Sequence, residues 1–376
     1  MLRIVAAEFL VSLAVLALQE VPRGHGLLTL AGVALLIGAL PLLLRGSRVA
    51  REAPPRWFGR ALGGAVALFA VAQLVFAIVR TVKPKVLDIA TTTVAAVGAV
   101  AQGGNPYALP IDPLAGGIAG VGAAFHGYKY LPAMLLAYAP LVLPLGVRGT
   151  VVTNILLQGA TAAALAALAA RRGGRIGGLA AALFYLSLPF PAHQLFTRGV
   201  NDLAAVLPLL LALLLIERRP GWAGLMAGLS IAAKLMPGLV VLPCLLPARG
   251  RGRFALGLCA GLLPILPFAA ATPAAFADNI LLFNLLRPID DTSWLWHVPA
   301  AAAPARGIAV LALAVLYGWV WARQPEPDTR AAAAALAILV VLLAGPDMHH
   351  NYYLWFIPLF TLLAARAATG RPREAG

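Results

Sequence analysis

Charged residues and cysteines are scarce in this sequence. Only 11% of the 376 residues are charged, against roughly 25% in a soluble domain, whereas 61% are hydrophobic. The two cysteines, Cys244 and Cys259, both lie in apolar segments, which favours small core residues over a disulfide or a metal site. The sequence also lacks a P-loop, a nucleophile elbow, a CxxC pair and a dinucleotide glycine motif. These absences exclude an ordinary soluble domain and predict an integral membrane protein.

Long runs of leucine, alanine and valine supply the spans that such a protein needs. A spanning helix takes about 20 mostly apolar residues, and runs without alternating polarity favour helices over a β-barrel. Glu8 interrupts the first run and no small-x-small cleavage site is obvious, so we expect a retained span and not a signal peptide. We therefore expect an all-α polytopic protein with about 12 transmembrane helices. The expected spans are about 4–19, 27–44, 61–80, 151–170, 176–192, 203–216, 221–233, 236–247, 254–271, 306–322, 331–345 and 351–366.

The net charge of +15 predicts the orientation of these spans. Cytosolic connectors of membrane proteins carry an excess of Lys and Arg, and no aromatic-interleaved basic patch points to nucleic acid. If the apolar segment 131–147 crossed the membrane, three later arginine-rich connectors would face outward. These connectors are 171–175, 217–219 and 248–253. Pro132, Pro140 and Pro144 suit a re-entrant or interfacial segment instead. Both termini are then cytosolic, and 19 of the 29 Lys and Arg face inward.

The opposite, outer face collects the polar chemistry. All six histidines and seven of the eight aspartates fall on that face. Five outward segments carry the candidate polar residues, at 80–148, 193–202, the turn around Lys234, 278–297 and 345–353. Segments 88–102 and 278–287 are expected to be interfacial helices, and GGNP at 103–106 would end the first one. The outer face is therefore the expected site of function.

Two aspartates on this face each have two interpretations. Asp88 lies just beyond a span, where a carboxylate within about 3 Å of an acceptor hydroxyl could act as a general base. Alternatively, Asp88 is only the N-cap of the helix expected at 89–102. Asp202 precedes the span 203–216 and either caps it or pairs with the nearby Asn201 and Arg198 in a site.

Four basic residues belong to outward segments that should converge on one cavity: Lys129, Arg198, Lys234 and Arg287. Several fixed cations in a low-dielectric pocket suit a phosphate or pyrophosphate. A lone Lys or Arg near the end of a span more often extends to lipid headgroups. Lys234 has apolar residues on both sides, which favours a function. Lys234 and Pro237 also separate two short spans, which indicates either a site within the membrane or two helices meeting at the outer surface.

The adjacent histidines His349 and His350 raise the question of a metal. Adjacent side chains point to different faces of a helix, and no third ligand has zinc-like spacing, so a hydrogen-bonding or proton-relay role is favoured. We therefore expect no cofactor, although a divalent metal stays open. The nearby aromatic residues are more typical of a membrane-interface belt than of sugar stacking. They are Trp294, Trp296, Tyr352, Tyr353 and Trp355.

The order of several short motifs resembles a known family. After the aspartate that follows a span come NPY (105–107), YKYLP (128–132), GVND (199–202), AKLMP (233–237) and RPIDDTSW (287–294). This pattern is similar to membrane glycosyltransferases of the C-type (GT-C) fold. It most resembles glycosyltransferase family 87, the polyprenyl-phosphate-mannose-dependent mannosyltransferases. The resemblance covers about 61–366 as a transmembrane core. Two additional spans and a cytosolic loop at 1–60 precede this core, and a cytosolic tail at 367–376 follows it.

The resemblance implies an inverting glycosyltransferase, with Asp88 as general base. The sugar, mannose by resemblance, would move from a polyprenyl-phosphate carrier to a hydroxyl of a lipid or glycan acceptor. The four basic residues above would bind the donor phosphate. The substrate-binding candidates are Asn105, Tyr107, Tyr128, Tyr130, Asn201, Asp202, Asp290, Asp291, His349, His350 and Asn351.

Two other classes of function stay open. One is a lipid or glycolipid transporter or flippase, disfavoured because no internal repeat is obvious and because the polar residues lie on one face and not at the midplane. The other is an inactive or scaffolding protein of the same fold. Richness in Ala, Arg, Gly and Pro favours a bacterial plasma membrane, with the active site extracytoplasmic. No nucleic-acid partner is expected.

Overall fold

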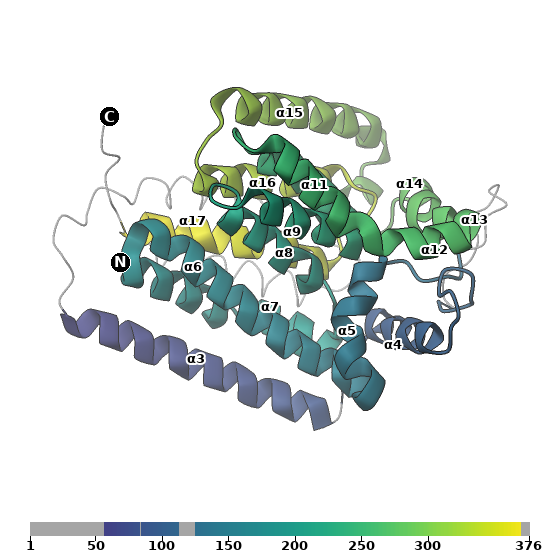
Figure 1. Cartoon of the computed structure of the whole chain (residues 1–376), viewed down its shortest axis with the longest axis horizontal. Coiled ribbons are helices and arrows are strands. Elements are labelled where there is room, and N and C mark those ends of the chain that lie inside the picture. Colours follow the sequence, from purple (N-terminus) through teal and green to yellow (C-terminus); the bar gives the residue numbers. More distant parts are fainter. Residues whose placement is uncertain (1–55, 83, 113–124, 370–376) are drawn as a thin grey trace. The chain divides into compact units, whose positions relative to one another are not determined.

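The computed structural model describes residues 56–82, 84–112 and 125–369, so the expected spans 4–19 and 27–44 lie outside it. Every regular element in the described part is helical, which confirms the all-α class (Figure 1). The α-helices are α3 (Arg56–Val82), α4 (Asp88–Ala101), α5 (Pro132–Leu145), α6 (Val147–Ser187), α7 (Pro189–Ala192), α8 (Leu203–Leu215), α9 (Pro220–Ala233), α10 (Leu235–Val241), α11 (Arg251–Leu262), α12 (Leu266–Ala271), α13 (Pro273–Ala277), α14 (Phe283–Leu286), α15 (Ala302–Arg323), α16 (Pro327–Ala344) and α17 (Ile357–Thr369).

Among the described residues, five helical segments are long and apolar enough to cross a membrane, or up to six if one bent pair counts as a single span. They are Trp57–Val82, Val147–Arg171, Arg251–Ala271, Pro299–Arg323 and Pro327–Ala344, with Gly173–Ser187 and Pro189–Arg198 as the bent pair. Several other expected spans are shorter helices, such as α8 with 13 residues. The expected span 351–366 begins as a 3₁₀-helix, His350–Trp355, before α17. A total of about 12 spans therefore stays a prediction.

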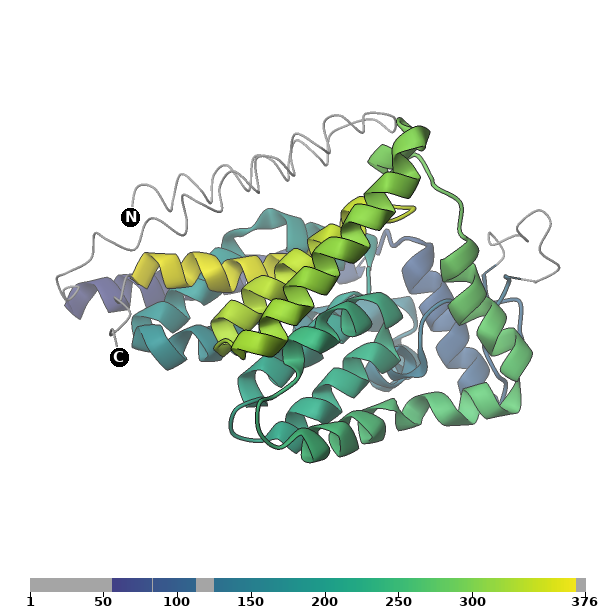
Figure 2. The same cartoon turned by 90° about the horizontal axis from the view of Figure 1, so that it is seen from above.

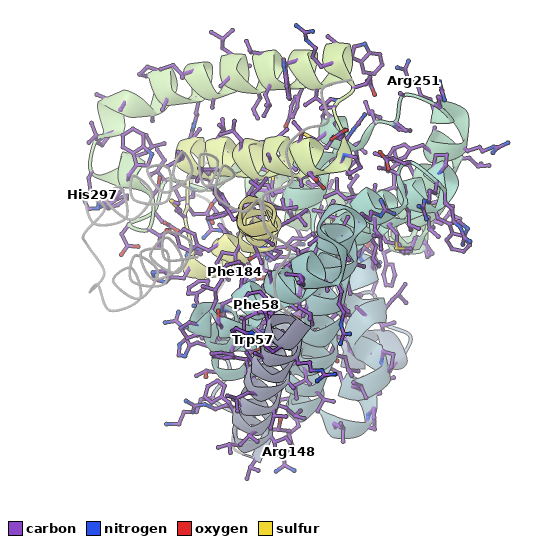
Figure 3. All side chains as sticks on the ribbon, turned by 90° about the vertical axis from the view of Figure 1, so that its left-hand side faces the viewer. Trp57, Phe58, Arg148, Phe184, Arg251 and His297 are labelled. Atoms are coloured by element: carbon purple, nitrogen blue, oxygen red, sulfur yellow. The ribbon has the colours of Figure 1, made fainter. Side chains whose placement is uncertain are left out.

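The long helices α3 and α15 expose apolar side chains along their length. Leu68 on α3 is 68% exposed and Val310 on α15 is 69% exposed, and Trp57 stands out at the start of α3 (Figure 3). A soluble protein rarely exposes such continuous apolar surface. Lipid is the solvent that suits these two helices, because it makes apolar exposure favourable and leaves the backbone hydrogen bonds within each helix.

The described residues form two compact units, and each is described by itself. The first comprises Met1–Val75, Gly159–Ala192 and Ile289–Gly376, as far as these ranges are described; the second comprises Phe76–Gln158 and His193–Pro288. In the first unit, α15 packs on α16 and α16 on α17 (Figure 2).

The arginine-rich connector 171–175 contains a turn, as the sequence predicted. Gly174, with φ 59° and ψ −159°, interrupts the continuous helix α6. Beyond it, Gly178 lies so close to the preceding half that a Cβ would be 2.9 Å from the Ala166 carbonyl oxygen. The chain therefore turns back between the expected spans 151–170 and 176–192.

Glycines bring α9 and α11 into close contact in the second unit. A Cβ on Gly224 would lie 1.9 Å from the Phe254 carbonyl oxygen, and one on Gly257 would lie 1.9 Å from that of Gly221. Small residues at such spacing let two helix backbones approach closely in a membrane, where packing and not the hydrophobic effect holds helices together. The chain break at Lys234 therefore follows a helix that is closely packed on α11.

The apolar segment 131–147 folds as α5, a helix of 14 residues. At 1.5 Å per residue it is about 21 Å long, shorter than a hydrocarbon core of about 30 Å. It packs on α4, α8 and α9, and Tyr138 and Met134 from α5 are fully buried. The expected spans 203–216 and 221–233 also fold as short helices, of 13 and 14 residues, so the re-entrant or interfacial position of 131–147 stays a prediction.

Candidate active site

Asp88 begins the helix α4 at the expected position. Its Oδ1 accepts one hydrogen bond, from the adjacent Ile89 N–H at 2.9 Å, and α4 has no side-chain cap bond. An N-cap side chain would instead accept from a residue two or three positions further on, so the N-cap alternative is wrong in its geometry. Asp88 is exposed, and its Oδ2 has no donor among the described residues. A negative charge is favoured at a helix N-terminus, where free N–H groups point toward it.

The segment GVND lies directly beside the start of α4. The Leu87 N–H donates to the Arg198 carbonyl at 2.9 Å. Gly199 has φ +69° and packs against Val86 and Ala90, where a Cβ would lie 2.8 Å and 3.0 Å from their side chains. Only glycine meets both demands without strain. The backbone of Arg198 therefore lies beside the start of α4, and its guanidinium makes no hydrogen bond or ion pair within the described residues.

The Tyr130 phenol interacts electrostatically with Asp88 and with two further charged residues. Burial raises the pKa of the Tyr130 phenol well above its usual value, the carboxylates of Asp202 and Asp88 raise it further, and Arg287 opposes them. Asp88, Asp202 and Arg287, all in the second unit, therefore act electrostatically on the same tyrosine. The Arg287 guanidinium also lies 5.8 Å from the ring centre of Phe283.

Lys234 is one half of a buried ion pair. Its Nζ lies 2.6 Å from Asp202 Oδ1, with side-chain exposures of 10% for Lys234 and 0% for Asp202. The same ammonium lies 5.0 Å from the ring centre of Tyr130. Asp202 does precede α8, but its side chain makes no cap bond there, so capping is wrong and pairing with Lys234 replaces it. Lys234 itself is extended, with φ −149° and ψ 119°, and separates α9 from α10 as expected.

Lys129 donates all three of its ammonium hydrogens to protein oxygens. The acceptors are the carbonyls of Phe125 and Gly127, the latter at 2.8 Å, and Asn279 Oδ1 at 2.6 Å. Burial lowers the pKa of Lys129 to about 8, and Asp112 opposes that shift. This lysine holds the turn 125–129 together, and the structure shows its donors used within the protein.

The NPY motif also makes contacts within the protein. Asn105 donates to Thr272 Oγ1 at 2.8 Å and to the Phe268 carbonyl at 3.2 Å. The buried Tyr107 donates to the Tyr130 carbonyl at 2.7 Å and stacks edge-on with Phe276. These bonds fix the backbone of Tyr130. Its neighbour Tyr128, fully buried, is 3.2 Å from Thr93 Oγ1 on α4.

Asn201 carries a buried acceptor with no donor. The residue is 1% exposed, its Nδ2 is 3.5 Å from Thr93 Oγ1, and its Oδ1 has no hydrogen-bond partner in the described structure. A buried carbonyl oxygen without a partner is costly, so such a group commonly serves a ligand or water. Asn201 immediately precedes Asp202, next to the ion pair.

The remaining predicted residues lie in the first unit, in two loops. The Asp290 N–H donates to the Pro346 carbonyl at 2.9 Å, which joins the loop of RPIDDTSW to the loop of GPDMHH. His349 Nε2 lies 3.6 Å from Asp290 Oδ2 and 3.6 Å from Asp347 Oδ2. Asp291 is exposed, His350 is half-buried, and Asn351 is buried.

Three residues that the sequence analysis did not select prove to hold the two clusters. Asn154 accepts from Tyr138 and donates to two carbonyls of the segment 195–200, each at 2.9 Å. Asn279 ties the turn 125–129 to the NPY loop. Asp347 is the buried partner of His349. The available signal was a polar residue in an apolar span for Asn154, and position in an outward polar segment for Asn279 and Asp347.

Comparison with solved structures identifies the fold. ArnT from Cupriavidus metallidurans, in the crystal structure described as bound to undecaprenyl phosphate, matches with a TM-score of 0.54 and 15% identity, covering 81% of this chain and 60% of that one. The apo structure of the same protein matches with a TM-score of 0.54 and 17% identity, over 82% and 60%. The fold is thus that of GT-C membrane glycosyltransferases, and the chain spans about 60% of the length of these solved structures.

The family is set by the sequence match. Glycosyltransferase family 87 matches residues 128–346, more than half of the chain, and the protein belongs to that family. The match includes Arg198, Lys234, Arg287 and the loop of Asp290, whereas Asp88 precedes it and Asp347 and His349 follow it. No curated protein matches the chain.

Proposed function

We propose that this protein is an inverting glycosyltransferase that uses a polyprenyl-phosphate-linked sugar as its donor. Family 87 membership supports sugar transfer, and the likeness in fold to a protein crystallised with undecaprenyl phosphate supports a polyprenyl-phosphate donor. The observation that carries the proposal is the position of Asp88: an exposed carboxylate at the start of α4, beside the backbone of Arg198 and electrostatically coupled to Tyr130.

Asp88 acts as the general base. It accepts the proton of the acceptor hydroxyl as that oxygen attacks the anomeric carbon from the face opposite the phosphate. The bond between the anomeric carbon and the phosphate oxygen breaks, and the polyprenyl phosphate leaves with the bonding electron pair. A phosphate leaving group needs no protonation by an acid, so one carboxylate suffices, unlike the pair of a glycoside hydrolase.

Arg198 and Arg287 meet the negative charge that develops on the leaving phosphate. Arg198 is the stronger candidate, because its guanidinium has no partner within the described residues and its backbone contacts the start of α4. A fixed guanidinium is a favourable phosphate ligand because its donors match two oxygens at once.

Lys234 and Lys129 support this site from within the protein. The ion pair of Lys234 with Asp202 places a fixed dipole behind the Tyr130 ring, and the three bonds of Lys129 hold the turn that carries Tyr130. The unpartnered Oδ1 of Asn201 would accept a hydroxyl of the substrate. Mannose as the sugar, a lipid or glycan as the acceptor, and an extracytoplasmic site in a bacterial plasma membrane complete the proposal.

The first experiment measures transfer of labelled mannose from polyprenyl-phosphate mannose by purified protein, with a membrane lipid extract as acceptor. We expect product, and we expect Arg198→Gln to raise the donor KM by roughly 10-fold or more, because a charge-assisted hydrogen bond contributes about 1.5–3 kcal/mol. The exposed Lys85→Gln is the matched control, since it removes a charge from the segment before α4 without altering Arg198.

A transporter would give a different result. In liposomes that carry the lipid-linked sugar in only one leaflet, a transporter would move the intact donor to the other leaflet without cleaving it. Cleavage-free translocation by the wild-type protein, together with an absence of product in the transfer assay, would replace the glycosyltransferase proposal.

A further inference from the structure

Two carboxylates and one imidazole meet between the two loops of the first unit. The ligand atoms of Asp290, Asp347 and His349 all lie within 4.8 Å of one another. Asp347 follows the end of α16, and Asp290 precedes the start of α15. These two helices pack together as an antiparallel pair, so the cluster lies at one end of that pair. Nothing in the proposed transfer reaction uses it.

The spacing within this cluster is that of ligands around a common ion. His349 Nε2 lies 3.6 Å from Oδ2 of each aspartate, beyond the usual hydrogen-bond range of about 2.7–3.2 Å. Imidazole nitrogen and carboxylate oxygen bind Zn²⁺ at about 2.0–2.2 Å, which for a tetrahedral site separates two ligand atoms by about 3.4 Å. A small movement would bring all three atoms to bonding distance of one cation.

Further hydrogen bonds aim both carboxylates. Asp290 Oδ1 accepts from the Thr292 N–H at 2.9 Å and from the Thr292 hydroxyl at 2.5 Å, which turns its Oδ2 toward His349. The Tyr352 hydroxyl donates to Asp347 Oδ2 at 2.6 Å. Partners of this kind orient ligands around protein-bound metals.

The two loops are also joined independently of any ion. Thr292 Oγ1 accepts from the Met348 N–H at 2.9 Å, Ser293 donates to the Gly345 carbonyl at 3.0 Å, and the Trp294 indole donates to the Leu343 carbonyl at 2.6 Å. The ligands are therefore held close together by the fold. The two side-chain carboxylates are 28% and 10% exposed, and their proximity favours a positive charge between them.

We propose that Asp290, Asp347 and His349 form a binding site for a divalent cation of the Zn²⁺ or Mn²⁺ class. One nitrogen and two carboxylate ligands suit these ions better than Ca²⁺ or Mg²⁺, which prefer sites made of oxygen alone. Three protein ligands leave coordination positions for water or for a ligand oxygen. Spacing along the chain does not reveal this site, because Asp290 comes from a different loop. It is independent of the role proposed for Asp88.

The test measures direct binding of Mn²⁺ to the full chain in detergent. Binding is monitored as loss of the electron paramagnetic resonance signal of free Mn²⁺, and Zn²⁺ is the competitor. We expect one Mn²⁺ per chain, displaced by Zn²⁺. Asp347→Asn and His349→Gln should each raise the Mn²⁺ dissociation constant by roughly 100-fold, and Tyr352→Phe, which keeps every ligand, by roughly 10-fold. His297→Gln is the control, an exposed histidine in the same loop region (Figure 3).

Each other outcome contradicts the site. Wild-type protein that binds neither ion overturns it, and the cluster is then an ion triad of two carboxylates with a protonated imidazole. Binding that survives both Asp347→Asn and His349→Gln places the ion elsewhere. Gel filtration and thermal unfolding of each variant exclude misfolding as the cause of lost binding, and Tyr352→Phe tests the site without removing a ligand.

Discussion

Replacing Lys234 with methionine separates a structural role for this residue from a role in phosphate binding. Lys234→Met removes the ammonium that lies 2.6 Å from Asp202 Oδ1 and keeps most of the side-chain volume. The Asp202 side chain has 0% exposure, so water cannot replace the lost partner. The variant therefore leaves an uncompensated buried charge.

The geometry gives the magnitude. At 2.6 Å the gross Coulomb attraction is about 6 kcal/mol at an effective dielectric constant of about 20, and the desolvation of both charges offsets much of it. Removing one member of a buried pair costs about 3–5 kcal/mol, whereas replacing both is often neutral. We expect Lys234→Met and Asp202→Asn each to destabilise the protein by an amount in that range. The double variant should be less destabilised than either single variant.

The assay measures thermal and denaturant unfolding in detergent, monitored by tryptophan fluorescence. The wild type, the two single variants and the double variant are compared as a double-mutant cycle. Donor KM is measured in parallel. Additive losses, or single variants that unfold like the wild type, would refute a stabilising ion pair. A Lys234→Met protein of normal stability with a strongly raised donor KM would instead assign Lys234 to the donor phosphate.

Three further predictions concern the supports of the site. Gly257→Ala should destabilise the protein by about 1–3 kcal/mol, because its Cβ would lie 1.9 Å from the Gly221 carbonyl oxygen. Gly252→Ala, on the same helix but with open space around it, is the control and should leave the stability unchanged. Equal thermal unfolding of the two variants would contradict the close packing of α9 on α11. Asn279→Ala should cost about 1–3 kcal/mol for each buried group left unsatisfied, among them the Gly127 N–H and the Tyr107 carbonyl, and unchanged unfolding would show that this asparagine is dispensable. The pKa of Lys129 in the folded protein, about 8, lies below its ordinary value, so above pH 8 the folded chain binds fewer protons than the unfolded chain. The stability of the wild type should therefore rise from pH 8 to 9.5 relative to that of Lys129→Arg, which stays charged. Parallel stability profiles of the two proteins would contradict the burial of Lys129.

The sequence predicted local features of this fold well. The turn in the connector 171–175 is at Gly174, the helix predicted at 88–102 begins at Asp88, and the helices break at Lys234. These features depend on runs of apolar residues, on glycine and on charge, all of which are visible along the chain. Whether the helix Pro132–Leu145 crosses the bilayer stays a prediction.

The partners of the charged side chains were not predictable. Asp202 pairs with Lys234 and does not cap α8. Lys129 donates hydrogen bonds to oxygens of Phe125, Gly127 and Asn279. These contacts join segments that are far apart along the chain, and no periodicity reports them. The same reason hid Asp347, whose neighbour Asp290 comes from a different loop.

The role of Asp88 is tested most directly by sugar transfer with Asp88→Asn, with donor binding measured on the same preparation. Asp278→Asn is the matched control, since Asp278 also begins a short helical segment but lies outside the proposed site. Loss of a general base should lower kcat by about 100-fold or more while donor binding stays at the wild-type level. Transfer by Asp88→Asn at the wild-type rate would contradict the assignment of Asp88 as the base.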